Sequence, residues 1–282
     1  RDGAPRAALK ADGPTTASVT GGNLSFNGQT FIGSNGVLGY SQNADSPNVV
    51  IGKGGNLVDG GVFGASILGG GAVGTYASVA TAPNRVRDIF GVVGGGTSNQ
   101  AGDGAGTTLD RGWAFVGGGF SNVASGQGSA VVGGSGNWAK VSYTFIGGGQ
   151  GNNAGGVFPF GTYAVVAGGK QNTASGDNST VIGGFTNLAS NSGATVLGGY
   201  NNAANGYLAT AAGYRAKANH NWSFVWSDGQ EADFASTATN QFRIRALGGL
   251  NLMDGDMYLG TLTPAFGSGG NAYFENSGGD SK

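Results

Sequence analysis

Few side chains in this sequence could carry out a reaction. There is no cysteine, so thiol chemistry, disulfides and cysteine-type zinc sites are all excluded. A Ser–His–Asp triad would have to use His220, the single histidine. Glycoside cleavage needs two placed carboxylates, and the glutamates are limited to Glu231 and Glu275. One enzymatic arrangement stays open, which is a pair of carboxylates assembled between subunits, for example from Asp103 or Asp110. We nevertheless expect no enzyme activity, no catalytic residue and no cofactor.

Two aspartate-containing segments raise the question of calcium. Segments 228–233 and 254–256 could offer carboxylate oxygens to the ion, but neither has the spacing of an EF-hand loop. Aspartate also does not recur at a fixed period, which excludes the calcium-binding nonapeptide roll. The sequence therefore predicts no metal site.

Composition restricts the class of protein. Glycine makes up 61 of 282 residues without a Gly-X-Y period, which excludes collagen, and a hydrophobic content of 39% excludes a disordered chain. Charged residues make up 10% and the net charge is −1, so no nucleic-acid partner is expected. No run of about 18 apolar residues predicts a membrane span, and no apolar core of a signal peptide is present. We interpret the chain as a processed product or a piece of a longer polypeptide.

A 15-residue repeat through the centre of the chain must build the scaffold. Each copy ends a glycine run at an anchor, and the anchors are Gly96, Gly119, Gly134, Gly149, Gly169, Gly184 and Gly199. Three residues before each anchor is a β-branched residue: Val93, Val116, Val131, Ile146, Val166, Val181 or Val196. Three residues after it is an asparagine: Asn99, Asn122, Asn137, Asn152, Asn172, Asn187 or Asn202. Alanine always follows two residues later, and such a period is typical of stacked coils in a solenoid.

The fixed positions predict two short strands in each coil. In one copy Val181 and Gly183 form a pair at spacing two, and so do Asn187 and Ala189, which places each pair on one face of a strand. We expect the β-branched residues to form a narrow core and Gly183 to allow close backbone approach. The asparagines should form a hydrogen-bonded ladder between coils. A substitution of Thr186, in a turn, should be nearly silent.

The first strand of the coil also carries apolar residues on its outer face. These trimer-interface candidates are Phe115, Val132, Phe145, Val165, Ile182 and Leu197. A strand that is apolar on both faces is covered on both faces, and one column of coils cannot cover its own outside. The simplest cover is a copy of the same chain, so we predict a closed homo-oligomer.

Two insertions interrupt the regular coils, one near Asp103–Arg111 and one at 156–160. Insertions in a solenoid emerge as surface loops and often make contacts. The receptor-contact candidates are therefore Asp103, Thr107, Asp110, Arg111, Phe158 and Phe160. The aromatic residues of the second loop could instead pack between subunits.

The remaining segments frame the repeat. We interpret 1–22 as a flexible lead or stalk link, 23–92 as irregular β coils in which Gly71 is an earlier anchor, and 93–218 as regular coils. Residues 219–262 are rich in aromatics and predict a β cap, with a sugar-binding platform as the alternative. The segment 263–282 is a Gly/Ser-rich tail. The fold class is thus all-β: a parallel β-roll solenoid with 15-residue coils.

The motifs Ser179-x-Val181-x-Gly183 and Asn172-x-Ala174-x-Gly176 resemble the head repeats of trimeric autotransporter adhesins of the YadA type. The string from Ala211 to Trp226, and segments 46–56, 99–111 and 233–249, are similar to those of bacterial surface and phage fibre-like proteins. The resemblance to the adhesin heads covers roughly residues 90–219. It implies a left-handed β-roll that forms homotrimers and is extracellular, on a bacterial cell surface or a virion-like fibre.

The expected function is that of a structural and adhesive fibre segment. Three identical faces would repeat weak contacts to a cell-surface glycan or matrix protein, so that avidity exceeds the affinity of a single site. One alternative is a filament or sheath subunit without a receptor, and another is a tailspike-like enzyme that degrades polysaccharide. An ice-binding solenoid is disfavoured, because outward threonines are limited to Thr180, Thr195 and Thr210.

Overall fold

The computed structural model describes residues 24–26, 29–32, 37–41, 46–52, 55–71, 74–76, 79–157 and 160–250. The chain divides into two units, 1–245 and 246–282, and the fold given below is that of the first unit. The predicted lead at 1–22, the tail at 263–282 and Phe158 lie outside the described residues. Regular structure in the described part is all β. No helix found there is long and apolar enough to cross a membrane.

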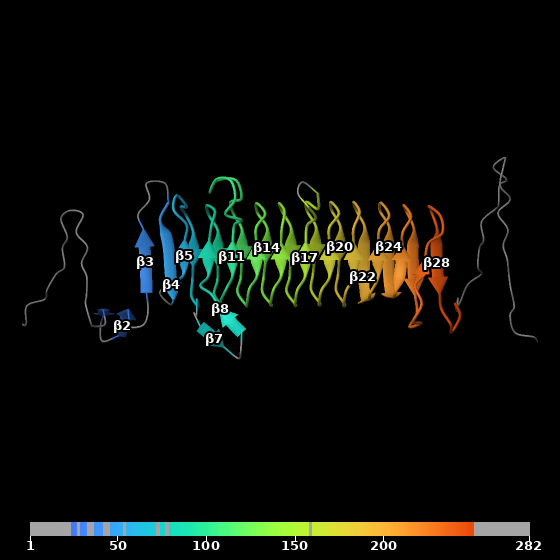
Figure 1. Cartoon of the computed structure of the whole chain (residues 1–282), viewed down its shortest axis with the longest axis horizontal. Coiled ribbons are helices and arrows are strands. Elements are labelled where there is room, and N and C mark those ends of the chain that lie inside the picture. The colour runs from blue at the N-terminus through green and yellow to red at the C-terminus, as the bar shows by residue number, and fades with distance from the viewer. Residues whose placement is uncertain are drawn as a thin grey trace, which may run out of the picture. The chain divides into compact units, whose positions relative to one another are not determined.

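Two long sheets form the first unit (Figure 1). The 13-stranded sheet contains β3 (Val37–Ser41), β4 (Asn48–Gly52), β6 (Ser66–Ile67), β10 (Val92–Val93), β12 (Phe115–Val116), β14 (Ala130–Val131), β16 (Phe145–Ile146), β18 (Val165–Val166), β20 (Thr180–Val181), β22 (Thr195–Tyr200), β24 (Thr210–Tyr214), β26 (Phe224–Ser227) and β28 (Phe242–Arg245). The 11-stranded sheet contains β5 (Leu57–Val58), β9 (Arg85–Val86), β11 (Gln100–Ala101), β13 (Val123–Ala124), β15 (Trp138–Ala139), β17 (Asn153–Ala154), β19 (Thr173–Ala174), β21 (Leu188–Ala189), β23 (Ala203–Ala204), β25 (Ala216–Ala218) and β27 (Phe234–Ala235).

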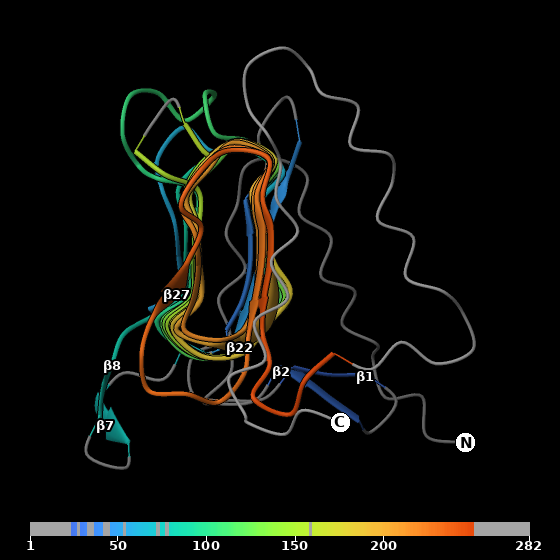
Figure 2. The same cartoon turned by 90° about the vertical axis from the view of Figure 1, so that its right-hand side faces the viewer.

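Successive coils place equivalent residues side by side. Val131 in β14 pairs in parallel register with Val116 on one side and Ile146 on the other. Apart from the antiparallel β3–β4 pair, every described pairing in the two sheets is parallel. The two sheets face each other across the coil (Figure 2). The chain is therefore a parallel β-solenoid of about 12 turns, and the prediction of two short strands per coil is confirmed.

Two hairpins lie outside these sheets. Strands β1 (Leu24–Phe26) and β2 (Gln29–Ile32) form one, and β7 (Gly74–Tyr76) and β8 (Val79–Thr81) form the other. The second hairpin belongs to an insertion between the turn at Gly70 and Asn84, which sequence analysis did not separate from the coils.

The core is one side-chain layer thick, as predicted. All seven β-branched residues of the repeat are fully buried and project from the 13-stranded sheet. They face a column of fully buried alanines from the other sheet: Ala101, Ala124, Ala139, Ala154, Ala174, Ala189 and Ala204. A branched residue opposite an alanine fills a constant small volume in every coil, so the coils stack without voids.

The asparagine ladder is present and its polar atoms are paired. Asn137, fully buried, donates from Nδ2 to the carbonyls of Gly133 and of Gly149, both at 3.0 Å. Its Oδ1 accepts the backbone N–H of Asn152, the same ladder position in the next coil, at 2.9 Å. An unpaired buried amide group would destabilise the fold. A column of asparagines is tolerated in the interior because these hydrogen bonds pair its amide groups.

The anchor glycine, and not the glycine before it, makes the close backbone approach. A Cβ on Gly184 (φ 90°) would lie 2.1 Å from the carbonyl oxygen of Gly199, whereas a Cβ on Gly183 would meet nothing within 4 Å. The prediction of tight packing at Gly183 is therefore wrong. Strand β20 ends at Val181, so the alternation of faces does not extend two residues further.

The coil pattern continues beyond the regular repeat at both ends. Gly70, rather than Gly71, holds the earlier anchor position, because a Cβ there would lie 2.0 Å from the oxygen of Gly96. Asn84 continues the ladder from that side, donating to the carbonyl of Gly96 at 2.9 Å. At the other end β26 and β28 extend the 13-stranded sheet in parallel register. That residues 219–262 cap the solenoid stays a prediction.

Candidate functional site

The first insertion forms a loop over residues 102–112, between β11 and β12, and it is fastened at several points. Asp103 turns the chain by accepting the N–H of Ala105 at its own Oδ1 (2.9 Å). The carbonyl of Thr108 accepts the N–H of Ile89, in the preceding coil, at 2.9 Å. Gly104 and Gly106 both have a φ near 67°, which suits a loop that reverses direction over few residues.

A cavity of about 410 Å³ lies between this loop and the neighbouring coils. Its walls are residues 57–60 at β5, Arg85 of β9, Arg87 and Asp88 just after β9, and loop residues 104–108. Arg85 and Asp59 form a two-pronged ion pair across one wall, with Nε–Oδ1 at 2.6 Å and Nη2–Oδ2 at 3.0 Å. The cavity is thus lined by charged groups and backbone and suits a polar ligand.

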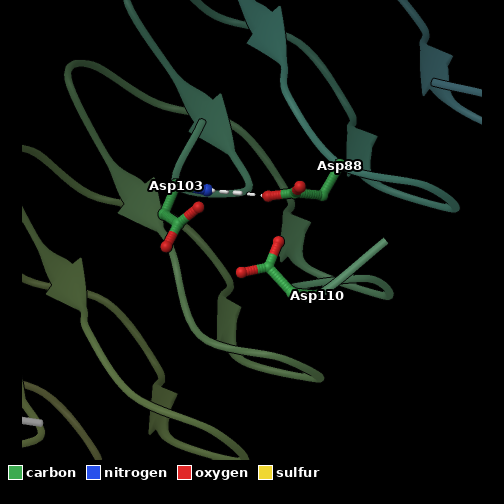
Figure 3. A group of neighbouring side chains, drawn as sticks. All are labelled: Asp88, Asp103 and Asp110. Atoms are coloured by element: carbon green, nitrogen blue, oxygen red, sulfur yellow. Dashed lines mark hydrogen bonds between the residues drawn. The ribbon is translucent and has the colours of Figure 1, made fainter. Parts of the chain in front are cut away.

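An acidic cluster adjoins the cavity. Asp88, Asp103 and Asp110 each place a carboxylate oxygen within 4.8 Å of the others, and Figure 3 shows the three side chains converging. The backbone N–H of Asp103 donates to Asp88 Oδ2 at 2.9 Å, and Arg111 Nε lies 3.4 Å from Asp103 Oδ2. Asp88 is 1% exposed, and Asp110 is exposed.

Burial and repulsion raise the pKa of Asp88 above its ordinary value. Burial of its carboxyl is the largest cause, and the charges of Asp103 and Asp110 add to it. Hydrogen bonds from the backbone of Asp103 and Gly104 act in the opposite direction. An ionised Asp88 is therefore held under electrostatic stress that a cation would relieve.

The four first-loop candidates gather at this place. Thr107 lines the cavity, Asp103 and Asp110 belong to the acidic cluster, and Arg111 pairs with Asp103. Sequence analysis missed Asp88 and the Arg85–Asp59 pair, which lie in the coils before the loop. The signal was the run Arg-Val-Arg-Asp at 85–88, because charged residues are scarce in this chain.

The second loop is a separate feature. Phe160 is 65% exposed, and Asp177 holds the end of the loop by accepting the N–H groups of Gly161 (2.8 Å) and Thr162 (2.9 Å). The Thr162 hydroxyl also donates to Asp177 and is the largest cause that lowers its pKa; burial acts in the opposite direction, and the two backbone bonds lower the pKa further. None of the described residues of this loop lines the cavity beside the first loop.

His220 takes part in a local contact. Its Nδ1 lies 2.8 Å from Oγ of Ser236, which is 4% exposed and accepts the backbone N–H groups of Asn219 and His220. A buried hydroxyl that receives two N–H groups fixes a turn and is not presented to a substrate.

The outer face of the 13-stranded sheet forms a second, apolar feature. Five of the interface candidates have exposed side chains: Phe115 39%, Val132 49%, Phe145 39%, Ile182 52% and Leu197 47%. Val165 is partly exposed. Their outward position agrees with the prediction, and their part in an interface stays a prediction.

Large and small residues alternate on this face so that it stays level. The two outward residues of each coil are Phe115 and Gly117, Ala130 and Val132, Phe145 and Gly147, Val165 and Ala167, Thr180 and Ile182, and Thr195 and Leu197. A Cβ on Gly117 would lie 3.4 Å from Cε1 of Phe115, so that ring lies beside the glycine. In these six coils one bulky side chain stands at either of two positions, and Thr180 and Thr195 add hydroxyl groups to this otherwise apolar surface. We call it the outer apolar face.

Comparisons with models of known protein families and with curated proteins give no match.

Proposed function

We propose that this chain is a segment of an extracellular structural and adhesive fibre, built from three copies that pack through the outer apolar face. The observation that carries the proposal is the row of exposed apolar side chains that successive coils place on this face. A soluble chain does not leave such a face to water, because burying it is favourable in proportion to its area.

The occupant that fits best is a second copy of the chain. The side chains of this face repeat at the spacing of the coils. The same face of a second copy has the same spacing, so its bulky side chains can pack beside the small residues of the first copy. Few charged residues interrupt it, which suits a permanent rather than a transient contact. The number three and the extracellular location follow from the resemblance to trimeric adhesin heads and fibre-like proteins.

Receptor binding is assigned to the first loop and its cavity. Repetition of the cavity on each copy would multiply weak contacts to a glycan or matrix protein. Arg85, Arg87 and Asp59 supply donors and acceptors of the kind that recognise sugar hydroxyls or charged side chains.

The oligomer is tested by sedimentation or light scattering of the full chain. Leu197→Lys should dissociate the trimer, because it places a charge on the outer apolar face. Leu208→Lys is the matched control. The side chain of Leu208 is 49% exposed, much like that of Leu197 at 47%, but Leu208 lies in a turn away from the outer apolar face. A wild-type chain that is a stable monomer would overturn the proposal.

The adhesive role is tested on glycan and matrix-protein arrays. Shortening the first loop should abolish binding by the intact trimer, while shortening the second loop tests Phe160. Binding unchanged by both deletions would remove the loops from the proposal. New reducing ends in a capsular polysaccharide would instead identify an enzyme, and long homopolymers without bound ligand would identify a filament subunit.

A further inference from the structure

The acidic cluster of the first loop contains a buried oxygen that nothing in the described chain satisfies. Asp88 is 1% exposed, and among the described residues its Oδ1 has no hydrogen-bond partner. Figure 3 shows the Asp88 carboxylate directed toward Asp103 and Asp110. Buried carboxylate oxygens are normally paired, so an unpaired oxygen on a carboxylate that adjoins two others indicates a missing positive ligand.

Two arginines beside the cluster contact Asp103. Arg111 lies 3.4 Å from Asp103, and the Nη1 of Arg87 donates to the backbone carbonyl of Asp103 at 3.5 Å. Among the described residues, Oδ1 of Asp88 still has no hydrogen-bond partner.

The donor set selects the kind of cation. Carboxylate oxygens are hard ligands, which suit Ca²⁺ or Mg²⁺ and do not favour the softer transition metals. Two oxygens on opposite sides of a Ca²⁺ ion, each about 2.4 Å away, are up to about 4.8 Å apart. The three oxygens lie within 4.8 Å of one another, which is compatible with a Ca²⁺ shell, and Ca²⁺ accepts an irregular arrangement of ligands more readily than Mg²⁺ does.

We propose that Asp88, Asp103 and Asp110 bind one Ca²⁺ ion per chain. Asp88 belongs to the turn after β9, whereas Asp103 and Asp110 belong to the loop. The ion therefore fastens the loop to the neighbouring coil and fixes the wall of the cavity at residues 104–108. This site stands apart from the proposed fibre function and does not depend on it.

Calorimetric titration of the chelator-treated full chain with CaCl₂ at pH 7 tests the site. We expect one ion per chain with a Kd on the order of 10⁻⁴ M, as in extracellular calcium modules, and weaker binding of MgCl₂. Asp110→Asn should weaken Ca²⁺ binding at least tenfold, and Asp110 is exposed, so the variant should fold. Asp233→Asn is the control, because Asp233 pairs with Arg215 outside the cluster and its loss should leave binding unchanged.

A second measurement follows the loop itself. Trypsin cleavage after Arg111, followed by mass spectrometry, should slow severalfold when millimolar CaCl₂ is added, and this protection should be lost in Asp110→Asn. The proposal is overturned if no heat and no protection appear up to about 10 mM CaCl₂, or if Asp110→Asn binds as tightly as the wild type.

Discussion

Asn152 donates its backbone N–H to Oδ1 of Asn137, 2.9 Å away in the preceding coil. The same bond joins Asn172 to Asn152 and Asn187 to Asn172. Each asparagine side chain thus connects its own glycine turn to the next coil. Together the asparagines join successive coils along one edge of the solenoid. This relationship explains why the repeat contains asparagine at that position and no other polar residue.

Removal of one ladder side chain should be severe. Asn137→Ala leaves the Gly133 carbonyl and the Asn152 N–H without these partners, and the Gly149 carbonyl keeps only the N–H of Ser135, so we expect a loss of about 2–4 kcal/mol in the free energy of unfolding. Asn153→Ala is the control, since Oδ1 of Asn153 has no hydrogen-bond partner within the described residues. Chemical denaturation monitored by circular dichroism measures both. Equal losses would show that the ladder bonds contribute little.

The two glycines of one turn should differ in their tolerance of a methyl group. Gly184→Ala forces a Cβ to 2.1 Å from the oxygen of Gly199 at a φ of 90°, so we expect a loss of more than about 3 kcal/mol or failure to fold. Gly183→Ala has open space and should cost less than about 1 kcal/mol. Thermal denaturation of the two variants measures these losses. A greater loss at Gly183 would contradict the assigned geometry.

Thr186 is strained rather than neutral. Its φ is 55°, a left-handed conformation that a β-branched residue rarely adopts. Asn201 has the equivalent position one coil later, with a φ of 52°. We expect Thr186→Asn to raise the free energy of unfolding by about 0.5–1 kcal/mol, and Asn201→Thr to lower it by a similar amount. Differential scanning calorimetry measures the melting temperature of both variants. Two melting temperatures equal to that of the wild type would contradict the prediction.

Asp88 should make stability depend on pH. Its folded-state pKa is raised, first by burial and then by Asp103 and Asp110, so ionisation is costlier in the folded chain than in the unfolded one. The contribution of Asp88 to the free energy of unfolding is therefore most favourable below about pH 4, where the carboxyl is protonated in both states. This contribution is lost as the pH rises through the folded-state pKa.

The variant Asp88→Asn cannot ionise at this position. In the presence of chelator it should melt at a higher temperature than the wild type at pH 7, and the difference should disappear near pH 3. In millimolar CaCl₂ at pH 7 the order should reverse if the ion binds. Melting curves that stay parallel across this pH range would show that Asp88 ionises without cost.

Much of the fold could be predicted because the repeat states the same constraint many times. One copy such as 181–189 would be ambiguous, but a β-branched residue, a glycine run, an asparagine and an alanine recurring together leave only a stack of narrow coils. The outward positions of Ile182 and Leu197 followed from the same alternation. The error at Gly183 arose where that alternation was extended past the last strand residue.

The candidate site was predicted in part. Asp103, Thr107, Asp110 and Arg111 were found because they interrupt the period. Asp88 could not be found in this way, since it lies 15 residues before Asp103 and joins the cluster only when two coils stack.

The sequence by itself determined the solenoid, its core columns and the position of its loops, because these depend on local spacing that every coil repeats. Only the tertiary structure decided which glycine must lack a side chain and how each asparagine is paired. It also decided that Asp88 converges with Asp103 and Asp110 beside a cavity. The physical reason is that these are contacts between coils, where the distance between two atoms depends on the path of the intervening chain and on the register of the stack.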